Sequence, residues 1–325
     1  MISRRHFLAA SSAGALSALQ LTDARAQGYP SRPVRIVVPY AAGGTGDVLI
    51  RLMQEPMQKA LGQPIIVENR LGASGAIGTN YVKNAAADGY TLLQVGNSTI
   101  TTTLTQKSAG YDPIKDLLPV GLAATTPMVF LLNPVVPATN IAQLIAYARA
   151  NPGKLEFSSA GRGSLAHLAT ESFNQAAGLK MVFVPYQGAS QAVNAVLAGD
   201  VKVALTTPSD AINAFVAAGR VRMLAVSSAK RSPLLPNVPA ISETLPGFAV
   251  NAFFGVSAPA NTPAEIVARV NDAMNKALSE PAVQNHLKGL AMTPSPTSPA
   301  AFAELYRDEY ALWVKVAKAA GIEPE

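Results

Sequence analysis

The chain has 325 residues, a formal net charge of +6, 14% charged residues and no cysteine. The lack of cysteine excludes disulfides, cysteine metal sites and a lipid-modified cysteine anchor. The basic excess is scattered along the sequence, which argues against nucleic acid, because a nucleic-acid partner requires a dense Lys/Arg face. A mild positive balance suits a small acidic ligand better, and a chain of this length predicts two domains.

The first 26 residues are expected to be an export signal rather than part of the fold. Arg4 and Arg5 precede an apolar run at 7–21, and a small-x-small sequence ends at Ala26, where we expect cleavage. The arginine pair followed by Phe-Leu is typical of twin-arginine export, with the general secretory route as the alternative. Either route predicts a protein of the bacterial periplasm, with a net charge of +4 after cleavage.

Short β-rich runs alternate with longer helical patterns through the first third of the chain, which is typical of parallel sheets covered by helices. Pro56 lies inside the first helical pattern and is expected to kink or split it. We expect strands at 34–39, 64–68 and 91–95, and helices at 48–61 and 76–87.

The same rhythm restarts near residue 128, and helices close the chain, so we expect two similar α/β lobes with a ligand in the cleft between them. Residues 229–249 are rich in Pro and Ser and are expected to form a long connection. We expect strands at 128–132, 155–159, 182–185, 201–205, 223–226 and 253–257, and helices at 141–151, 165–177, 190–197, 211–218, 263–278, 282–289 and 299–321.

A glycine turn at 43–46 joins the first strand to the first helix and predicts a site for a negatively charged group. The free N–H groups of a first helical turn and the helix dipole attract anions, and glycine permits a close approach. A second such turn occupies 161–164. Polar loops also follow strands at 69–75, 97–98 and 206–208. They could be ordinary turns, but five of them at strand ends favour a shared cleft that donates hydrogen bonds to a carboxylate.

Known catalytic and nucleotide motifs are missing. The chain has no Gly-x-Ser-x-Gly elbow, no His-x-x-x-His pair and no phosphate-binding P-loop. Gly161-x-Gly163-x-x-Ala166 matches a dinucleotide fingerprint, but the acid expected about 20 residues later is missing. Ser164 and His167 leave a hydrolase as one alternative, although no acid is placed to orient the histidine.

An ordered series of motifs spans nearly the whole chain after the export signal. The stretches are 29–47, 67–75, 87–93, 111–113, 157–168, 184–186, 224–226, 258–263 and 313–322. Together they resemble the Bug receptors, the extracytoplasmic solute-binding components of tripartite tricarboxylate transporters. The resemblance implies an α/β, two-lobed periplasmic-binding-protein fold (Venus flytrap, type II), with the second lobe (127–251) inserted in the first (27–126 and 252–325).

The resemblance also implies a function without catalysis, cofactor or metal. A small organic acid would be captured between the lobes and delivered to membrane permease subunits by a monomeric receptor. A solute sensor that docks on a signalling receptor is the other alternative, because it would use the same pocket. Family members often have Pro and Ser where this chain has Ala42 and Thr45-Gly46, so the identity of the acid stays open.

Carried over to this chain, the resemblance implies that the first lobe seats a carboxylate and the second lobe closes on it. Asp47 is expected to cap its helix rather than to touch an anion. Arg162 could pair with a distal carboxylate or lie in solvent. The implied ligand-binding residues are Tyr40, Ala41, Gly43, Gly44, Thr45, Ser74, Asn97, Gly163, Ser164 and Thr207.

Overall fold

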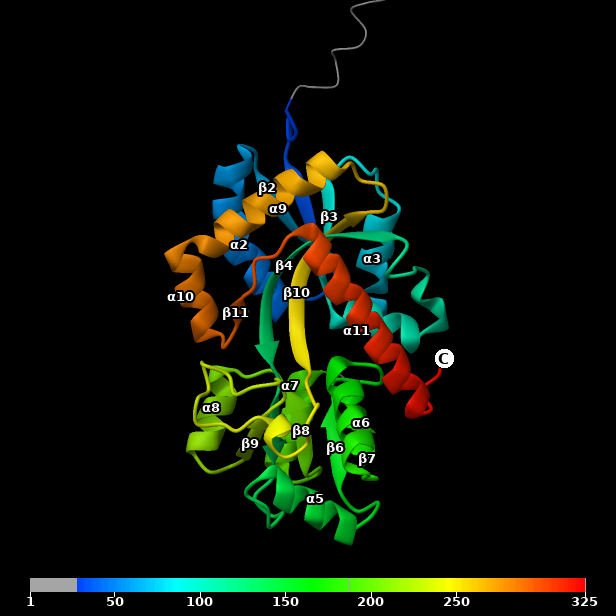
Figure 1. Ribbon diagram of the computed structural model, residues 1–325, viewed down its shortest axis with the longest axis vertical. Helices are drawn as coiled ribbons and strands as arrows, with labels where there is room; N and C mark the ends of the chain where they lie inside the picture. Colours follow the sequence, from blue (N-terminus) through cyan, green and yellow to red (C-terminus); the bar gives the residue numbers. More distant parts are fainter. Residues whose placement is uncertain (1–27, 187, 325) are drawn as a thin grey trace, which may run out of the picture.

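The computed structural model describes residues 28–186 and 188–324, so the predicted export signal lies outside the described residues. Two open sheets, each with helices packed on it, form two bodies stacked along the long axis of the molecule (Figure 1). This is the α/β two-sheet arrangement expected from the alternating strand and helix patterns.

The upper body is built on a six-stranded sheet in the order β11-β4-β10-β3-β1-β2. The three strands β1, β2 and β3 are parallel, whereas β10 is antiparallel to both β3 and β4. The strands are β1 (Val34–Val38), β2 (Ile65–Asn69), β3 (Thr91–Gly96), β4 (Leu117–Pro127), β10 (Asn251–Pro259) and β11 (Thr293–Pro294). The helices are α2 (Thr45–Leu61), α3 (Ala76–Lys83), α4 (Asn97–Thr101), α9 (Ala264–Ser279), α10 (Pro281–Gly289) and α11 (Pro299–Ala319).

The lower body is built on a five-stranded sheet in the order β7-β6-β8-β5-β9. Strand β6 is parallel to β7 and β8, and β5 is antiparallel to β8 and β9. The strands are β5 (Val129–Leu132), β6 (Glu156–Ser159), β7 (Val182–Pro185), β8 (Val203–Thr206) and β9 (Arg222–Val226). The helices are α5 (Ile141–Ala150), α6 (Leu165–Ala177), α7 (Ala189–Ala198) and α8 (Asp210–Ala217).

Four expectations from the sequence need adjustment. Helix α2 begins at Thr45 and continues through Pro56 without being split. Helix α3 ends at Lys83, earlier than expected. We predicted no helix or strand between β3 and β5, yet this region contains α4 and the long strand β4. The connection at 229–249 is irregular as expected, apart from a single 3-10 turn at Ile241–Glu243.

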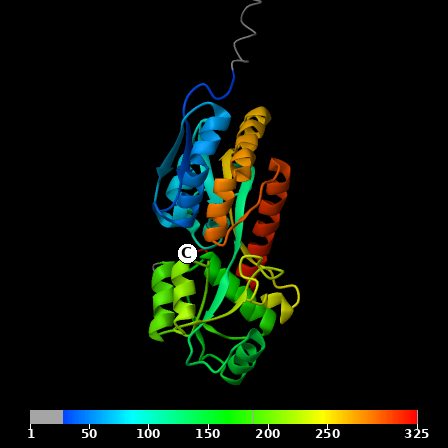
Figure 2. The same cartoon turned by 90° about the vertical axis from the view of Figure 1, so that its left-hand side faces the viewer.

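The chain crosses between the two bodies twice, and one serine joins the two crossings. The first crossing lies between β4 and β5, and Figure 2 shows β4 running from the upper body towards the lower one. The second leads from β9 back to β10. The hydroxyl of Ser227 accepts a hydrogen bond from Met128 N–H at 2.8 Å and donates one to the Val250 carbonyl at 2.5 Å. Since Ser227 is fully buried, it holds both crossings in one place.

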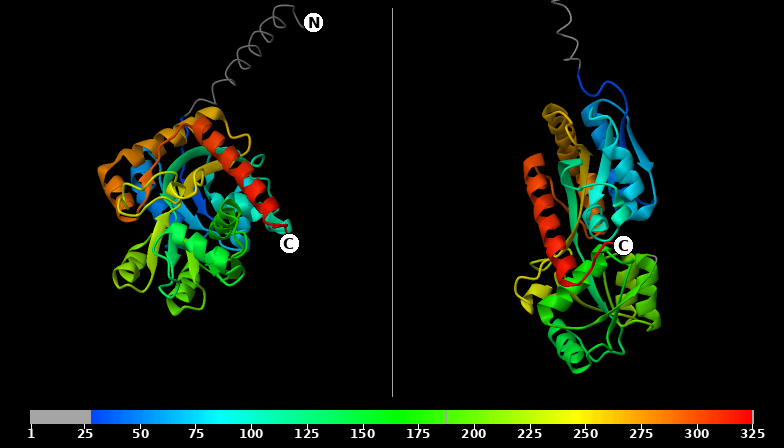
Figure 3. Two further views of the ribbon diagram at one scale, coloured as in Figure 1. Left: turned by 60° about the horizontal axis from the view of Figure 1, so that its bottom comes forward. Right: turned by 90° about the vertical axis from the view of Figure 1, so that its right-hand side faces the viewer.

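The last helix of the upper body also reaches the lower one. Helix α11 descends along the upper body until its end lies beside α6 (Figure 3). There the side-chain amide of Gln175 donates a hydrogen bond to the Val316 carbonyl at 3.2 Å. Trp313 is fully buried on the same helix. The two bodies are therefore joined at one side by a packed contact in addition to the crossings.

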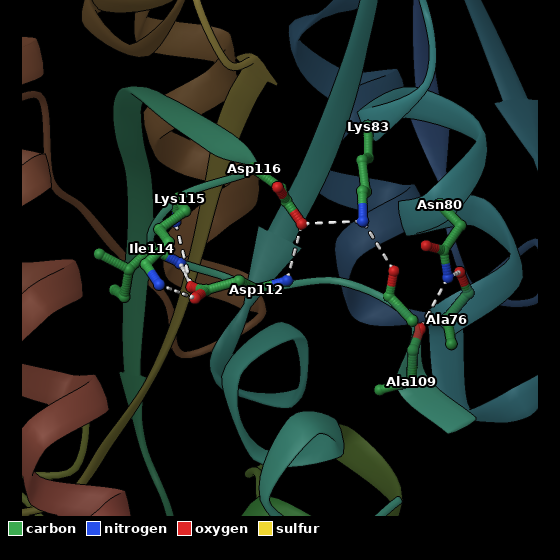
Figure 4. Close-up of polar contacts among 9 residues, drawn as sticks. Ala76, Asn80, Lys83, Ala109, Asp112, Ile114, Lys115 and Asp116 are labelled. Atoms are coloured by element: carbon green, nitrogen blue, oxygen red, sulfur yellow. Dashed lines mark hydrogen bonds and ion pairs between the residues drawn. The ribbon is translucent and has the colours of Figure 1, made fainter. Parts of the chain in front are cut away.

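The segment between α4 and β4 is held against α3 by a polar network (Figure 4). Lys83 forms an ion pair with Asp116 at 2.9 Å and donates a hydrogen bond to the Gly110 carbonyl at 2.8 Å. Asn80 donates to the Ala109 carbonyl at 2.7 Å. These contacts fix a segment that contains little regular structure, and they support the loops that face the second body.

Candidate functional site

A cavity of about 240 Å³ lies between the two sheets. The carboxyl ends of strands and the first turns of helices from both bodies surround it, which is the usual position of ligands in open α/β sheets. Its lining comes from both bodies and from the first crossing: Tyr40, Gly46, Gln94, Gly96, Asn97, Ser98, Met128, Ser159, Ala160, Ser164, Leu165, Ala166, Ala189, Ala192, Val193, Ala204, Leu205, Thr206, Thr207, Ala252, Phe253 and Phe254.

The first glycine turn is shaped from within by Asp47. Its carboxylate accepts hydrogen bonds from Gly43 N–H, Arg51 Nε and Asn69 Nδ2, each at 2.9 Å. Burial favours the protonated form of Asp47, but these hydrogen bonds outweigh it and hold its pKa below the ordinary value. The side chain is thus occupied by the turn before the helix, and the expectation that it caps α2 is wrong, because Gly44 is the N-cap and no side chain caps the helix.

The first turn of α2 is open to the cavity because no side chain caps it. The residue before the helix is Gly44, which has no side chain to accept from the first N–H groups. Those N–H groups lack partners within the helix, and the helix dipole adds partial positive charge at the same place. Gly46, in this turn, lines the cavity. Backbone donors at this point can therefore bind an anionic oxygen.

Gln94, on β3, lies directly beneath this turn. A methyl group placed on Gly46 would approach Gln94 Oε1 to 2.6 Å, so the glycine is required for the two to pack. Gln94 Nε2 donates to the Val95 carbonyl at 2.8 Å, whereas its buried Oε1 has no hydrogen-bond partner among the described residues. Buried polar atoms are nearly always paired, so the unpaired Gln94 Oε1, on a residue that lines the cavity, is a candidate ligand contact. Gln94 was not among the predicted site residues, although a polar residue inside the otherwise apolar run of β3 could have indicated it.

Tyr40 contacts two of the polar loops of the upper body, at 97–98 and 69–75. Its hydroxyl lies 2.5 Å from Ser98 Oγ, and its ring packs against the backbone of Gly75. Burial raises the pKa of Tyr40, so the phenol stays protonated at neutral pH. Both Tyr40 and Ser98 line the cavity. They can offer hydroxyl hydrogen bonds without exchanging protons with a ligand.

The side chain of Asn97 is engaged by protein groups. Its Nδ2 donates to Glu309 at 2.9 Å and to the Asn251 carbonyl at 3.2 Å, and its Oδ1 accepts from Phe253 N–H at 2.9 Å. Burial raises the pKa of Glu309, which reflects the cost of placing its charge here. Asn97 lines the cavity, yet its amide joins the start of β10 to α4 and α11 within the upper body.

The second glycine turn is braced by His167. Ser164 caps α6 by accepting from His167 N–H at 3.3 Å, and it donates to Ser159 Oγ at 3.2 Å. The imidazole Nδ1 accepts from Gly163 N–H at 3.1 Å. Burial, and then the positive charge of Arg162, lowers the pKa of His167 to about 4. The imidazole therefore supports the turn and does not activate the serine hydroxyl, which removes the Ser164–His167 hydrolase hypothesis.

Gly163 is a point of contact between the two bodies. Its φ is +76°, and a methyl group placed on it would come within 2.4 Å of Thr105 Cγ2. Thr105 belongs to the upper body, in the segment after α4. The second glycine turn can therefore approach the upper body closely only because Gly163 has no side chain.

The remaining site residues expected from the sequence do not line the cavity. Ala41, Gly43, Gly44, Thr45 and Ser74 are exposed. Ser74 Oγ accepts from Gln106 Nε2 at 2.9 Å. Tyr40, Asn97, Ser164 and Thr207 are brought together in the lining itself. Arg162 is exposed and lies outside that lining.

The electrostatics of the cavity come from backbone dipoles. Among the described residues that line it, none carries a charged side chain. The first turns of α2, α6 and α7 all contribute lining residues. Within 28–186 and 188–324, acidic and histidine side chains nowhere form a group that could hold a metal ion. In the same ranges, no helix is both long and apolar enough to span a bilayer.

Comparison with known proteins identifies the family. The sequence profile described as "Tripartite tricarboxylate transporter family receptor" matches residues 49–322. The structure of R. palustris Rpa4515 with adipate is 35% identical, covers 92% of this chain and 100% of its own, and superposes with a TM-score of 0.80. The periplasmic binding protein BugD is 32% identical over 91% of this chain and 100% of its own, with a TM-score of 0.77.

A third structure, MatC from Rhodopseudomonas palustris with bound malate, is 31% identical, covers 89% of this chain and 99% of its own, and has a TM-score of 0.76. These similarities confirm the predicted family and the periplasmic-binding-protein fold. The chain belongs to the receptor family of tripartite tricarboxylate transporters, and it is a periplasmic solute-binding protein rather than an enzyme.

Proposed function

We propose that this receptor captures a small organic acid in the cavity between the two sheets and delivers it to membrane permease subunits. The observation that carries the proposal is the uncapped first turn of α2, which shares a cavity without charged side chains with Ser164 of the lower body. Backbone N–H groups bind carboxylates strongly when water is excluded. The relatives crystallised with adipate and malate support the choice of a carboxylate.

The residues assigned from the sequence divide into two groups under this proposal. Tyr40, Ser164 and Thr207 contact the acid from both bodies, and Asn97 fixes the wall behind it. The other six shape the turns; among them, Gly43 and Gly163 already donate their N–H groups to Asp47 and His167. We add Gly46 to the contacts, and Gln94 as a residue whose unpaired Oε1 can accept a hydrogen bond from a hydroxyl group of the ligand. The six residues of the second group are Ala41, Gly43, Gly44, Thr45, Ser74 and Gly163.

The chain supports a cycle of opening and closing around its two crossings. An acid bound by both bodies stabilises the closed form, because only that form brings both sets of donors to it. We infer that the hinge lies at these crossings, near the expected lobe limits at 126/127 and 251/252, where Ser227 on the second crossing bonds to Met128 on the first. We propose that the receptor acts as a monomer and that the permease subunits recognise the closed form.

Calorimetry with the mature protein tests the ligand class. At least one carboxylate from a panel of di- and tricarboxylates, aromatic acids and monocarboxylates should bind with a Kd of about 10 μM or less. Thr45→Trp should weaken that binding at least about tenfold, because a bulky side chain at this position obstructs the first turn of α2. Thr244→Trp, at an exposed threonine outside the cavity, serves as the matched control. Unchanged affinity in Thr45→Trp would remove this loop from the site.

Export and delivery need separate tests. We propose cleavage after Ala26 and export by the twin-arginine route. N-terminal sequencing of the periplasmic protein should begin at residue 27, and export should stop when Arg4 and Arg5 are both changed to Lys. Uptake of the identified acid should require both this receptor and the permease subunits. Normal uptake in cells that lack the receptor would contradict a role in transport.

A further inference from the structure

A second hollow continues from the cavity into a groove between α7 and α8. The groove has a volume of about 320 Å³. It shares four residues with the cavity: Ala189, Val193, Thr206 and Thr207. The two hollows therefore adjoin at the carboxyl end of β8. Both helices belong to the lower body (Figure 1), so the continuation lies entirely within that body.

The groove is apolar at its floor and uncharged at its rim. Val193, Ile212 and Phe215 supply the apolar side chains, and Ser190 and Asn194 supply uncharged polar ones. Among the described residues that line it, none is charged. Burial of alkyl or aromatic surface here is favourable, whereas an ion would lose its hydration without gaining a partner.

The groove's end at α8 is also unsuited to an anion. Ser209 caps α8 by accepting from Ile212 N–H at 3.4 Å, so its own side chain occupies one of the first-turn donors. Asp210 adds a negative charge in the same turn. The first turn of α2 differs, because no side chain caps it and the aspartate in that turn, Asp47, is already paired with Arg51 at 2.9 Å. A carboxylate is thus favoured at the α2 end of the space and disfavoured at the α8 end.

Size supports an elongated ligand. A cavity of roughly 150 Å³ holds a benzene ring, so the space of about 240 Å³ next to α2 accepts a carboxylate and a few carbon atoms. A longer ligand must continue past Thr206 and Thr207 into the groove. There its far end would meet Val193, Ile212 and Phe215.

We propose that the groove between α7 and α8 is a binding subsite for the uncharged tail of the ligand. The preferred solute class is then a monocarboxylate with an elongated apolar body. This inference rests on the proposed function, since it places the carboxylate at the first turn of α2. It adds the location of the tail and the preference against a second charge.

Matched acids test the proposal by calorimetry. Hexanoate and octanoate differ in length, and adipate and suberate replace the terminal methyl group of each with a carboxylate. Affinity should rise about tenfold from hexanoate to octanoate, since each buried methylene contributes roughly a fourfold gain or slightly less. Suberate should bind at least about tenfold more weakly than octanoate, because its second carboxylate is buried without a partner.

Two variants locate the tail. Asn194→Trp should fill the groove and abolish the gain from hexanoate to octanoate, while leaving hexanoate binding within about twofold. Asn213→Trp, on α8 but outside the lining of the groove, is the matched control and should retain the gain. Asp210→Asn should raise the affinity for suberate by about threefold or more without changing octanoate, because it removes the like charge.

Three results would overturn the inference. If adipate and suberate bind as tightly as the matched monocarboxylates, the tail subsite is wrong while the carboxylate-binding function stands. If Asn194→Trp weakens hexanoate as much as octanoate, the residue acts on the head of the ligand and not on its tail. If no acid of any class binds to the intact mature protein, the proposed function fails together with the inference.

Discussion

His167 Nδ1 accepts a hydrogen bond from Gly163 N–H at 3.1 Å, and this bond holds the second glycine turn in place. The bond needs a neutral imidazole, because a protonated Nδ1 would face the N–H with a second donor. The ring is also buried and stacked on Phe183 with its centroid 3.9 Å away. Protonation of this one side chain should therefore disturb the turn that carries Ser164.

The pH dependence of stability should follow from this pair. The pKa of His167 is lowered from 6.5 to about 4 in the folded protein. Between these values the unfolded state binds more protons than the folded state, so stability rises with pH across this window and is lost as pH falls. The loss approaches about 3 kcal/mol by pH 4.

Urea unfolding at pH 4 to 7 measures this effect. His167→Gln should reduce the slope of stability against pH, since the titrating group is gone. His286→Gln, at an exposed histidine on α10, should keep the slope of the unmodified protein. An equal slope in the His167 variant would assign the pH dependence to other groups.

Gly163→Ala should weaken ligand binding more than it weakens the fold. The added methyl group would lie 2.4 Å from Thr105 Cγ2 and would separate the two bodies at the edge of the cavity. Closure around a ligand then becomes unfavourable, and we expect an affinity loss of about tenfold or more. Calorimetry with the ligand that binds tightest measures it.

Two further variants separate steric conflict from backbone strain. Gly178 also has a positive φ, of +63°, but a methyl group there would meet nothing within 4 Å. Gly178→Ala should therefore cost about 1 kcal/mol of stability without a loss of affinity. Adding Thr105→Ala to Gly163→Ala should recover part of the affinity. Without such recovery, the contact with Thr105 is not the cause.

Asn97→Ala should destabilise the protein by about 2 kcal/mol or more, because it leaves buried partners without hydrogen bonds. The partners include Phe253 N–H and the carboxylate of Glu309. Glu309→Gln should be neutral or stabilising at pH 7. Burial already raises the pKa of Glu309, and an amide oxygen can still accept from Asn97 and Trp313. Chemical denaturation measures both variants, and a large loss in Glu309→Gln would contradict this account.

Much of the fold follows from local patterns in the sequence. Strand β1 is a short β-branched run, and β1 and β6 are each followed by a glycine turn and an amphipathic helix. Strand β4 was missed because Pro119 and Gly121 lie inside it, and both residues weaken a strand assignment. The structure explains Gly121: a methyl group there would meet Asn271 Nδ2 at 2.6 Å, where Asn271 donates to the Val120 carbonyl.

The site was harder to predict than the fold. Both glycine turns lie between a strand and a helix as expected, because such a turn is a local feature, and four of the predicted site residues line the cavity. Gln94 and Ser227 were missed because their roles depend on distant partners. The two partners of Ser227 lie 99 and 23 residues away in the chain. No periodicity within a window of sequence can report such a contact.

Ser227→Ala should destabilise the protein by about 2 kcal/mol and alter closure. The substitution leaves Met128 N–H and the Val250 carbonyl without the hydroxyl that now pairs both of them in a fully buried position. Unpaired buried backbone groups cost about 1–3 kcal/mol. Because these groups lie on the two crossings, the loss of their hydrogen bonds should loosen the hinge as well as the fold.

Ser228→Ala, at a neighbouring serine whose hydroxyl bonds only locally to the Lys230 carbonyl, should change stability by about 0.5 kcal/mol or less. Urea unfolding compares the two variants, and stopped-flow binding reports whether the closing rate changes. Equal stability of the two variants would show that the crossings do not depend on the Ser227 hydroxyl.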